Sequence, residues 1–204
     1  MLSFIAVVIS LIPLYLLGSF PTGLIVARIH GIDITAKGSG NVGATNVSRV
    51  IGKRAGVLTL VGDALKGIIA LLLASVISNA EWFVALAGFI VVCGHCFSIP
   101  PWLKGGKGVA TGLGVLSFLY PLGALLAVVT FGVVFVLTRI VSLSSIVSAL
   151  IVPLAVFATN QGESLGWALA GISFVIVIRH HQNIVRLIEG REPRFASKGD
   201  AKTT

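Results

Sequence analysis

The stretch VATGLGVLSFLYPLGALLAVVTFGVVFVLT, residues 109–138, runs for thirty residues without a charged side chain. A helix needs about 20 apolar residues to cross the hydrocarbon core of a bilayer, so this stretch exceeds one span. Tyr120-Pro121 lies near its centre, and the residue before a proline is disfavoured in the helical conformation. We therefore expect two helices, a short one over 109–119 that is too short for an upright span, and a full span after it.

The composition of the whole chain agrees with a membrane protein. Its 204 residues are 56% hydrophobic and only 11% charged, and the mean hydropathy is +1.03, whereas soluble domains carry about 25% charged residues. Five more apolar runs cover residues 4–27, 56–77, 82–97, 141–159 and 165–178. The sequence predicts an all-α polytopic bundle. We expect one transmembrane domain over residues 1–195 and a polar, flexible cytoplasmic tail over 196–204.

The placement of charge predicts the topology. Lysine and arginine fill the first long loop, the loop after the third run and the C-terminal tail, and Arg139 separates two runs. The connections at 78–81 and 160–164 carry only Glu81 and Glu163. Because basic loops face the cytoplasm, the stretch between Lys104 and Arg139 must cross twice or not at all. We predict seven helices with the N-terminus outside, the C-terminus inside and the fourth helix short or broken; five long helices plus a re-entrant loop is the alternative.

The first cytoplasmic loop contains KGSGNVGATN, residues 37–46. Its G-x-G-x-x-G spacing matches a dinucleotide-binding turn, but such a turn follows a strand, and a membrane helix precedes this one. Glycines let a backbone approach a ligand, successive N–H groups bind anions, and Arg49 suits bidentate contact with phosphate. With Ser39 and Asn41 nearby, the loop predicts a phosphate site without a nucleotide fold; a plain glycine-rich connector is the alternative.

A second cluster, KGGKG at residues 104–108, lies at the start of the short fourth helix. A helix N-terminus presents unpaired N–H groups and a positive dipole end to an anion. The segment is not a P-loop, since Gly108 follows Lys107 where Ser or Thr would be required. Two lysines that snorkel to the interface are the alternative reading.

A third cluster, RHHQNIVRLIEGREPRF, spans residues 179–195 and reads as a basic amphipathic extension of the last span. At helical spacing, Arg179, Asn183 and Arg186 share one face. A basic anchor on anionic lipid is the alternative. A smaller cluster, TRIVSLSS at 138–145, adds hydroxyls beside Arg139. All four clusters fall on the same side of the membrane, which predicts one shared anion site.

Two features inside the apolar runs remain. Asp63 and Lys66 lie three residues apart, and since a charge at a helix centre costs about 2.5–3.5 kcal/mol, we predict a structural ion pair in preference to a catalytic role. The C-x-x-C of Cys93 and Cys96 lacks both a βαβ context and partner cysteines, which argues against a redox or zinc role. No metal or cofactor is expected.

The motifs GSGNVGATNVSR, GH followed by KGGKGVATGLG, and RHHQNIVRLIEGRE resemble the three signature motifs of the bacterial acyl-phosphate:glycerol-3-phosphate acyltransferases. The resemblance covers nearly the whole chain in motif order and spacing, and only CFSIPPWL at 96–103 departs from the family pattern. It implies a seven-helix enzyme of the bacterial inner membrane with its active site facing the cytoplasm. The implied reaction transfers a fatty acyl group from acyl phosphate to glycerol 3-phosphate, the first acylation step of phospholipid synthesis.

The resemblance also implies roles for individual residues. The expected glycerol 3-phosphate site comprises Ser39, Asn41, Arg49, Lys107, Ser145, His180 and Asn183. The expected acyl-phosphate and oxyanion loop comprises Lys104, Gly105, Gly106 and Gly108. Lys107 and His180 are the catalytic candidates, and either the leaving phosphate or His180 takes the hydroxyl proton. Membrane lipids, and a soluble enzyme that makes acyl phosphate, are the expected partners; no nucleic acid is expected.

A membrane transporter of a phosphorylated metabolite is the other function that we consider. It would also gather basic loops beside a cavity, but such carriers often show internal repeats and a polar path to the outer face. Here the outer connections are short, and we find no repeat. The sequence therefore favours the enzyme.

Overall fold

The computed structural model describes residues 4–99 and 104–195, and these residues form ten α-helices and no strand. In chain order the helices are α1 (Phe4–Ser19), α2 (Thr22–Ile29), α3 (Ala44–Val50), α4 (Lys53–Ile77), α5 (Glu81–Cys96), α6 (Val109–Leu119), α7 (Pro121–Thr138), α8 (Val141–Ala158), α9 (Glu163–Arg179) and α10 (His181–Ile188). The all-α prediction is confirmed. The tail predicted over 196–204 lies outside the described residues.

Four segments in the described part of the chain are long and apolar enough to cross a membrane, or five if α9 and α10 count as one bent span. Helices α5 and α6 are shorter apolar helices. The expected break at Tyr120-Pro121 is present, since α6 ends at Leu119 and α7 begins at Pro121. The bundle is therefore of the membrane type, while the count of seven spans and the orientation of the termini stay predictions.

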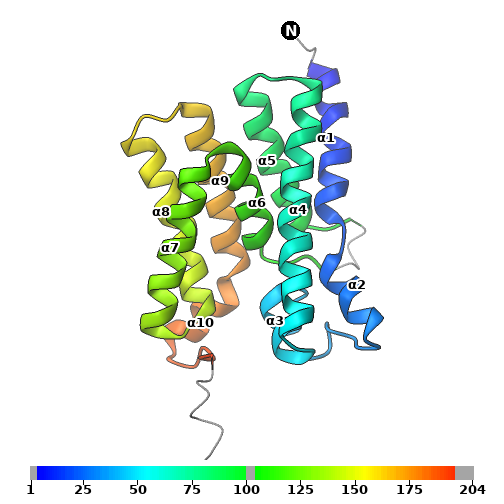
Figure 1. Ribbon diagram of the computed structural model, residues 1–204, viewed down its shortest axis with the longest axis vertical. Helices are drawn as coiled ribbons and strands as arrows, with labels where there is room; N and C mark the ends of the chain where they lie inside the picture. Colours follow the sequence, from blue (N-terminus) through cyan, green and yellow to red (C-terminus); the bar gives the residue numbers. More distant parts are fainter. Residues whose placement is uncertain (1–3, 100–103, 196–204) are drawn as a thin grey trace, which may run out of the picture.

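The helices stand side by side, and α6 occupies the middle of the bundle (Figure 1). Helix α6 packs on α4 and α7, α5 packs on α1 and α9, and α8 packs between α7 and α9. The short helices α2, α3 and α10 gather at the end opposite the N-terminus (Figure 1). This arrangement brings the three basic motifs to one end of the molecule.

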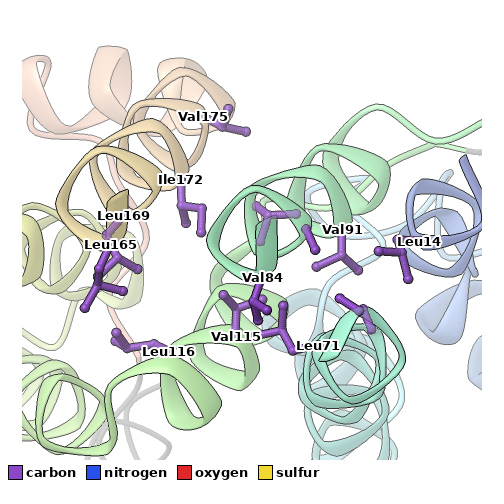
Figure 2. Packing of buried hydrophobic residues seen from close by; sticks show 14 of the residues in the cluster. Leu14, Leu71, Val84, Val91, Val115, Leu116, Leu165, Leu169, Ile172 and Val175 are labelled. Atoms are coloured by element: carbon purple, nitrogen blue, oxygen red, sulfur yellow. The ribbon is translucent and has the colours of Figure 1, made fainter. Parts of the chain in front are cut away.

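Apolar side chains fill the centre and also cover the outside. Val115 of α6 and Leu71 of α4 are fully buried and belong to one cluster with Ile172 of α9, and Figure 2 shows such side chains from α4, α5, α6 and α9 meeting between the helices. Large apolar residues such as Leu122 and Val136 are exposed along α7. An apolar outer face is the surface that lipid tails solvate, which agrees with the composition.

Helices α4 and α6 touch through their backbones. A Cβ atom added at Gly114 would lie 2.0 Å from the carbonyl oxygen of Ala64, and one added at Gly67 would lie 2.5 Å from that of Thr111. Small residues at such crossings let helices in membranes approach closely. The contact holds α6, and the loop before it, against the longest helix of the bundle.

We expect Gly114→Ala to lower the melting temperature of the detergent-solubilised protein, because overpacking against a backbone atom costs about 1–3 kcal/mol. Gly132→Ala on α7 is the matched control, since a Cβ there has no neighbour within 4 Å. Both changes gain about 1 kcal/mol of helix propensity. The difference in melting temperature between the two variants therefore measures the cost of overpacking at the α4–α6 crossing. Equal melting temperatures for the two variants would contradict this account of the α4–α6 contact.

The first apolar run, expected over 4–27, forms one candidate span over Ile5–Ile29 with a break between two helices inside it. Helix α1 ends at Ser19 and α2 begins at Thr22, because Pro21 lacks an N–H group and restricts the residue before it. At the break the carbonyl oxygen of Phe20 accepts two hydrogen bonds, one of 3.0 Å from the Thr22 N–H group and one of 3.1 Å from Lys66 Nζ. The break thus supplies a polar partner for a buried lysine.

Candidate active site

A polar cavity of about 510 Å³ lies where the three basic motifs meet. Its walls come from the loop before α3 and α3 itself, from α4, α5, α6, α7 and α8, and from the segment after α9. All seven residues expected to bind glycerol 3-phosphate line it, namely Ser39, Asn41, Arg49, Lys107, Ser145, His180 and Asn183. The structure thus brings together side chains that are up to 144 positions apart, from Ser39 to Asn183.

The glycine-rich loop over 38–43 is held by one buried amide. Asn46 Oδ1 accepts a hydrogen bond of 2.9 Å from the Ser39 N–H group, and its Nδ2 donates to the carbonyl oxygens of Asn41 at 2.8 Å and Lys37 at 3.1 Å. Gly38 has a φ of +60°, and a Cβ there would lie 2.2 Å from Asn46 Oδ1. The loop is therefore a fixed wall of the cavity, and Asn46 is the residue that fixes it.

Lys107 provides an ammonium group inside the cavity. Its Nζ donates a hydrogen bond of 2.5 Å to Asn183 Oδ1. Burial is the main cause that lowers the pKa of Lys107, and the positive charges of Arg186 and Arg179 act in the same direction. With the opposing effect of Glu192 included, the pKa is about 8. An arriving anion would relieve this repulsion, so the lysine is prepared to bind a negative charge.

His180, at the junction of α9 and α10, is neutral at physiological pH. Burial, followed by the charge of Lys107, lowers its pKa to about 4. Its Nδ1 lies 2.8 Å from the carbonyl oxygen of Ile176; because a carbonyl only accepts, Nδ1 carries the proton and Nε2 is an acceptor. His180 can accept a hydrogen bond from a hydroxyl group, but with this pKa it is a weak base.

Glu192, which the sequence analysis did not single out, ties the last segment to the cavity wall. Its Oε1 accepts hydrogen bonds from Ser142 Oγ at 2.7 Å and Asn183 Nδ2 at 2.5 Å, and its Oε2 accepts one from Arg186 Nε at 2.6 Å. Burial raises the pKa of Glu192, but these hydrogen bonds outweigh burial and hold the pKa below its usual range. The carboxylate fixes the amide of Asn183 so that Oδ1 faces Lys107.

The third motif is not one helix. The chain bends by 61° between α9 and α10, so the expectation that Arg179, Asn183 and Arg186 share one helical face is wrong. Asn183 and Arg186 line the cavity, whereas Arg179 does not. Arg179 instead donates to the carbonyl oxygens of Gly105 and Gly106.

The buried pair Asp63 and Lys66 is present, with 3.0 Å between Asp63 Oδ1 and Lys66 Nζ. His95 of α5 lies beside it: its Nδ1 is 3.2 Å from Thr111 Oγ1 and 3.7 Å from Asp63 Oδ1. Asp63 and His95 line the cavity. Asp63, but not Lys66, therefore forms part of the site's inner wall, together with a histidine that stood in the sequence only as part of a motif.

The expected oxyanion loop is divided by the structure. Gly108 lines the cavity with Lys107, but Lys104, Gly105 and Gly106 do not. Lys104 Nζ lies 3.5 Å from the carbonyl oxygen of Thr35, away from the cavity. Gly108 adopts a φ of +82° as the N-cap of α6, and a glycine at this position allows the chain to turn into the helix without strain.

A second, apolar groove of about 250 Å³ adjoins the polar cavity. It runs between α6, α7, α8 and α9, and its walls include Leu113, Val152 and Ile172. Five residues line both spaces: Leu60, Val109, Ala110, Phe131 and Ser145. A polar head and an apolar tail of one molecule could therefore occupy the two spaces together.

The comparison with known proteins identifies the family. Residues 8–190 match the family model described as glycerol-3-phosphate acyltransferase. The chain belongs to this family. Glycerol-3-phosphate acyltransferases of Trichlorobacter lovleyi and Geobacter sulfurreducens are 46% and 44% identical to it over 181 residues, which is 89% of this chain and 93% of each relative.

Solved structures agree. The crystal structure of PlsY (YgiH), an integral membrane glycerol 3-phosphate acyltransferase, in its glycerol 3-phosphate form, has a TM-score of 0.89 and 37% identity, and covers 97% of this chain and 99% of its own. The lysophosphatidic acid form has a TM-score of 0.85 and 39% identity over 93% of this chain and 95% of its own. The resemblance drawn from the motifs is confirmed, and the protein is an integral membrane acyltransferase of phospholipid synthesis.

Three residues of this acyltransferase site went unassigned in the sequence analysis: Asn46, His95 and Glu192. Asn46 and Glu192 act through hydrogen bonds to loop or side-chain atoms that only the folded chain brings close. His95 offered one signal, since a polar side chain within an apolar run needs a partner. Its partners Thr111 and Asp63 lie on two other helices, so spacing alone does not reveal them.

Proposed function

We propose that this acyltransferase moves a fatty acyl group from acyl phosphate to glycerol 3-phosphate, giving 1-acylglycerol 3-phosphate and inorganic phosphate, at the cytoplasmic face of the bacterial inner membrane. The observation that carries the proposal is the junction between the cationic cavity and the apolar groove at Val109, Ala110 and Ser145. One substrate is a small dianion, and the other joins a phosphate to a long apolar tail. Each space matches one of these parts.

The cationic cavity suits glycerol 3-phosphate. Arg49, Lys107 and Arg186 line it, and within residues 4–99 and 104–195 only Arg186 is paired directly with a carboxylate, that of Glu192. Phosphate is bound best by charge-assisted hydrogen bonds, and arginine can donate two in parallel. The crystal structure of the related PlsY in its glycerol 3-phosphate form supports this substrate.

The apolar groove suits the acyl chain. It lies between helices of the bundle and begins at the first turn of α6, so an acyl carbonyl at its entrance would face the start of that helix. The lysophosphatidic acid form of PlsY supports a product with an acyl tail. The donor therefore enters with its tail in the groove and its phosphate in the cavity.

The transfer step needs little covalent help from the protein. The glycerol hydroxyl oxygen bonds to the acyl carbon, the bond from that carbon to the phosphate oxygen breaks, and the hydroxyl proton passes to the departing phosphate. With a pKa of about 4, His180 is a weaker base than a phosphate dianion, whose conjugate acid has a pKa of about 6. His180 Nε2 accordingly orients the hydroxyl, and positioning supplies most of the rate.

The test uses the purified protein with palmitoyl phosphate and labelled glycerol 3-phosphate, scored for labelled lysophosphatidate. We expect acyl phosphate to react, and acyl-CoA or acyl-carrier protein alone to give no product above background, because the cavity offers no group that would activate a thioester. Comparable turnover with acyl-CoA would contradict the acyl-phosphate donor. Movement of labelled glycerol 3-phosphate into protein-containing vesicles, without acylation, would favour the transporter.

A further inference from the structure

Arg179, the first residue of the third motif, contacts the turn before α6 and the ring of Phe97. Its Nε donates a hydrogen bond of 3.0 Å to the carbonyl oxygen of Gly106, and its Nη2 donates one of 2.9 Å to that of Gly105. The guanidinium carbon lies 5.6 Å from the centre of the Phe97 ring. Arg179 does not line the substrate cavity, so direct binding of substrate does not explain it.

The same two glycines are held from the other side by the end of α5. The Gly106 N–H group donates a hydrogen bond of 3.0 Å to the carbonyl oxygen of His95. A Cβ at Gly106 would lie 2.1 Å from His95 Nε2, and one at Gly105 would lie 2.2 Å from the carbonyl oxygen of Cys96. The turn is thus fixed between Arg179 and α5 with no room for side chains.

Fixing these carbonyls also fixes the direction of the next N–H group. In a planar trans peptide the C=O and N–H bonds point in opposite directions. Since the Gly106 carbonyl faces Arg179, the Lys107 N–H group must point away from it. Lys107, Gly108, Val109 and Ala110 line the cavity, and in residues 4–99 and 104–195 we find no acceptor for their N–H groups.

We propose that Arg179 is a positioning residue of acyl transfer: by holding the carbonyls of Gly105 and Gly106, it aims the N–H groups of the 107–110 segment at the oxyanion that forms on the acyl carbonyl. This inference rests on the proposed function, since it needs an acyl group at the start of α6. When the glycerol hydroxyl adds to the acyl carbon, the carbonyl oxygen takes the negative charge, and it gives the charge back as phosphate leaves. Donors fixed in advance stabilise that charge without reorganisation.

The test compares kcat with KM for glycerol 3-phosphate in Arg179→Ala and Arg179→Lys. Because a small displacement of aligned groups costs up to about 100-fold, we expect kcat of Arg179→Ala to fall by about 10- to 100-fold, with KM changed by less than about twofold. Arg179→Lys keeps the charge but loses the planar fork, so its kcat should be intermediate. Arg191→Ala is the control, since that side chain is 71% exposed and, in the part of the chain that the structure describes, pairs only with Glu189, and it should behave as the wild type.

Chemical rescue separates positioning from folding. Low, non-denaturing concentrations of guanidinium or ethylguanidinium should restore part of the kcat of Arg179→Ala, because the ion can occupy the space between the turn and Phe97. They should not restore Arg179→Lys, whose own side chain fills that space. Rescue of Arg179→Ala alone would support the proposal.

Other outcomes would overturn it. A raised KM with unchanged kcat would make Arg179 a substrate-binding residue. A lower kcat that no guanidinium compound restores, with a melting temperature below that of Arg191→Ala, would make its role purely structural. The wild type is assayed alongside with acyl phosphate: an inactive wild type would contradict the proposed function, whereas an active wild type with an unimpaired Arg179→Ala contradicts only the positioning role.

Discussion

Replacing Lys107 by methionine is expected to lower kcat/KM for acyl transfer by about 100- to 1000-fold, the loss typical of removing one donor that acts on the developing charge. Lys107 is half-buried in the cavity wall and is the only lysine among the described residues that line the cavity. Methionine keeps most of the side-chain length, so the change removes the charge and leaves Asn183 Oδ1 without its donor. Steady-state kinetics with varied glycerol 3-phosphate measures the effect.

Lys104→Met is the matched control for this change. It removes the same group from the same short loop, but Lys104 Nζ lies 3.5 Å from the Thr35 carbonyl oxygen, and Lys104 does not line the cavity. An exposed contact of this kind contributes little, so we expect less than about a threefold loss. Equal losses in the two variants would show that the loop binds substrate through its overall charge and not through Lys107.

The pH dependence gives an independent measurement on the same residue. The pKa of Lys107 in the free protein is lowered to about 8, so its positive charge is present below that pH and is lost as the pH rises through it. We expect kcat/KM to fall above about pH 8, and to fall at higher pH in Lys107→Arg, because arginine stays protonated. An unchanged alkaline fall in Lys107→Arg would assign the titration to another group.

The membrane class and the membership of the cavity were both predictable from local patterns. Long uncharged runs predict helices because lipid offers no hydrogen-bond partner, so the backbone N–H and C=O groups must bond to one another. The polar clusters were predicted to converge because the positive-inside rule places basic loops on one side of the membrane, and the structure brings them to one cavity. Ser39 and Asn183 could be placed in one site on that argument, although nothing in their spacing says that they meet.

What the sequence did not predict depends on packing between distant elements. The bend at His180 lies within a run of residues that is compatible with a continuous helix, so Arg179 was placed on the same face as Asn183 when the two have separate surroundings. Pro21 predicts a break in the helix, but no local pattern predicts that the carbonyl oxygen of Phe20 at this break accepts a hydrogen bond from Lys66. Hydrogen bonds between side chains that are far apart in sequence leave no periodic trace.

Glu192 illustrates the same limit. In the sequence it stands in a charged segment, EGREPR, where a carboxylate reads as solvated. In the folded protein it accepts hydrogen bonds from Ser142, Asn183 and Arg186. By accepting a hydrogen bond from Asn183 Nδ2, the carboxylate of Glu192 leaves Asn183 Oδ1 facing Lys107.

Arg49 is expected to act on binding more than on the chemical step. It lies in the last turn of α3, is exposed, and lines the cavity, with no carboxylate partner among the described residues. A contact with the phosphate of glycerol 3-phosphate exists both before and during acyl transfer. Removing such uniform binding raises KM more than it lowers kcat.

The Arg49→Ala change should therefore raise KM for glycerol 3-phosphate by about 10- to 150-fold, the equivalent of about 1.5–3 kcal/mol for a lost charged hydrogen bond. Arg49→Lys keeps the charge without the bidentate fork, so a smaller KM defect should remain. Arg54→Ala is the control, because Arg54 is exposed at the start of α4 and does not line the cavity. An unchanged KM and kcat in Arg49→Ala would mean that the glycine-rich loop binds another ligand. A fall in kcat with an unchanged KM would mean that Arg49 stabilises the transition state and does not contribute to substrate binding.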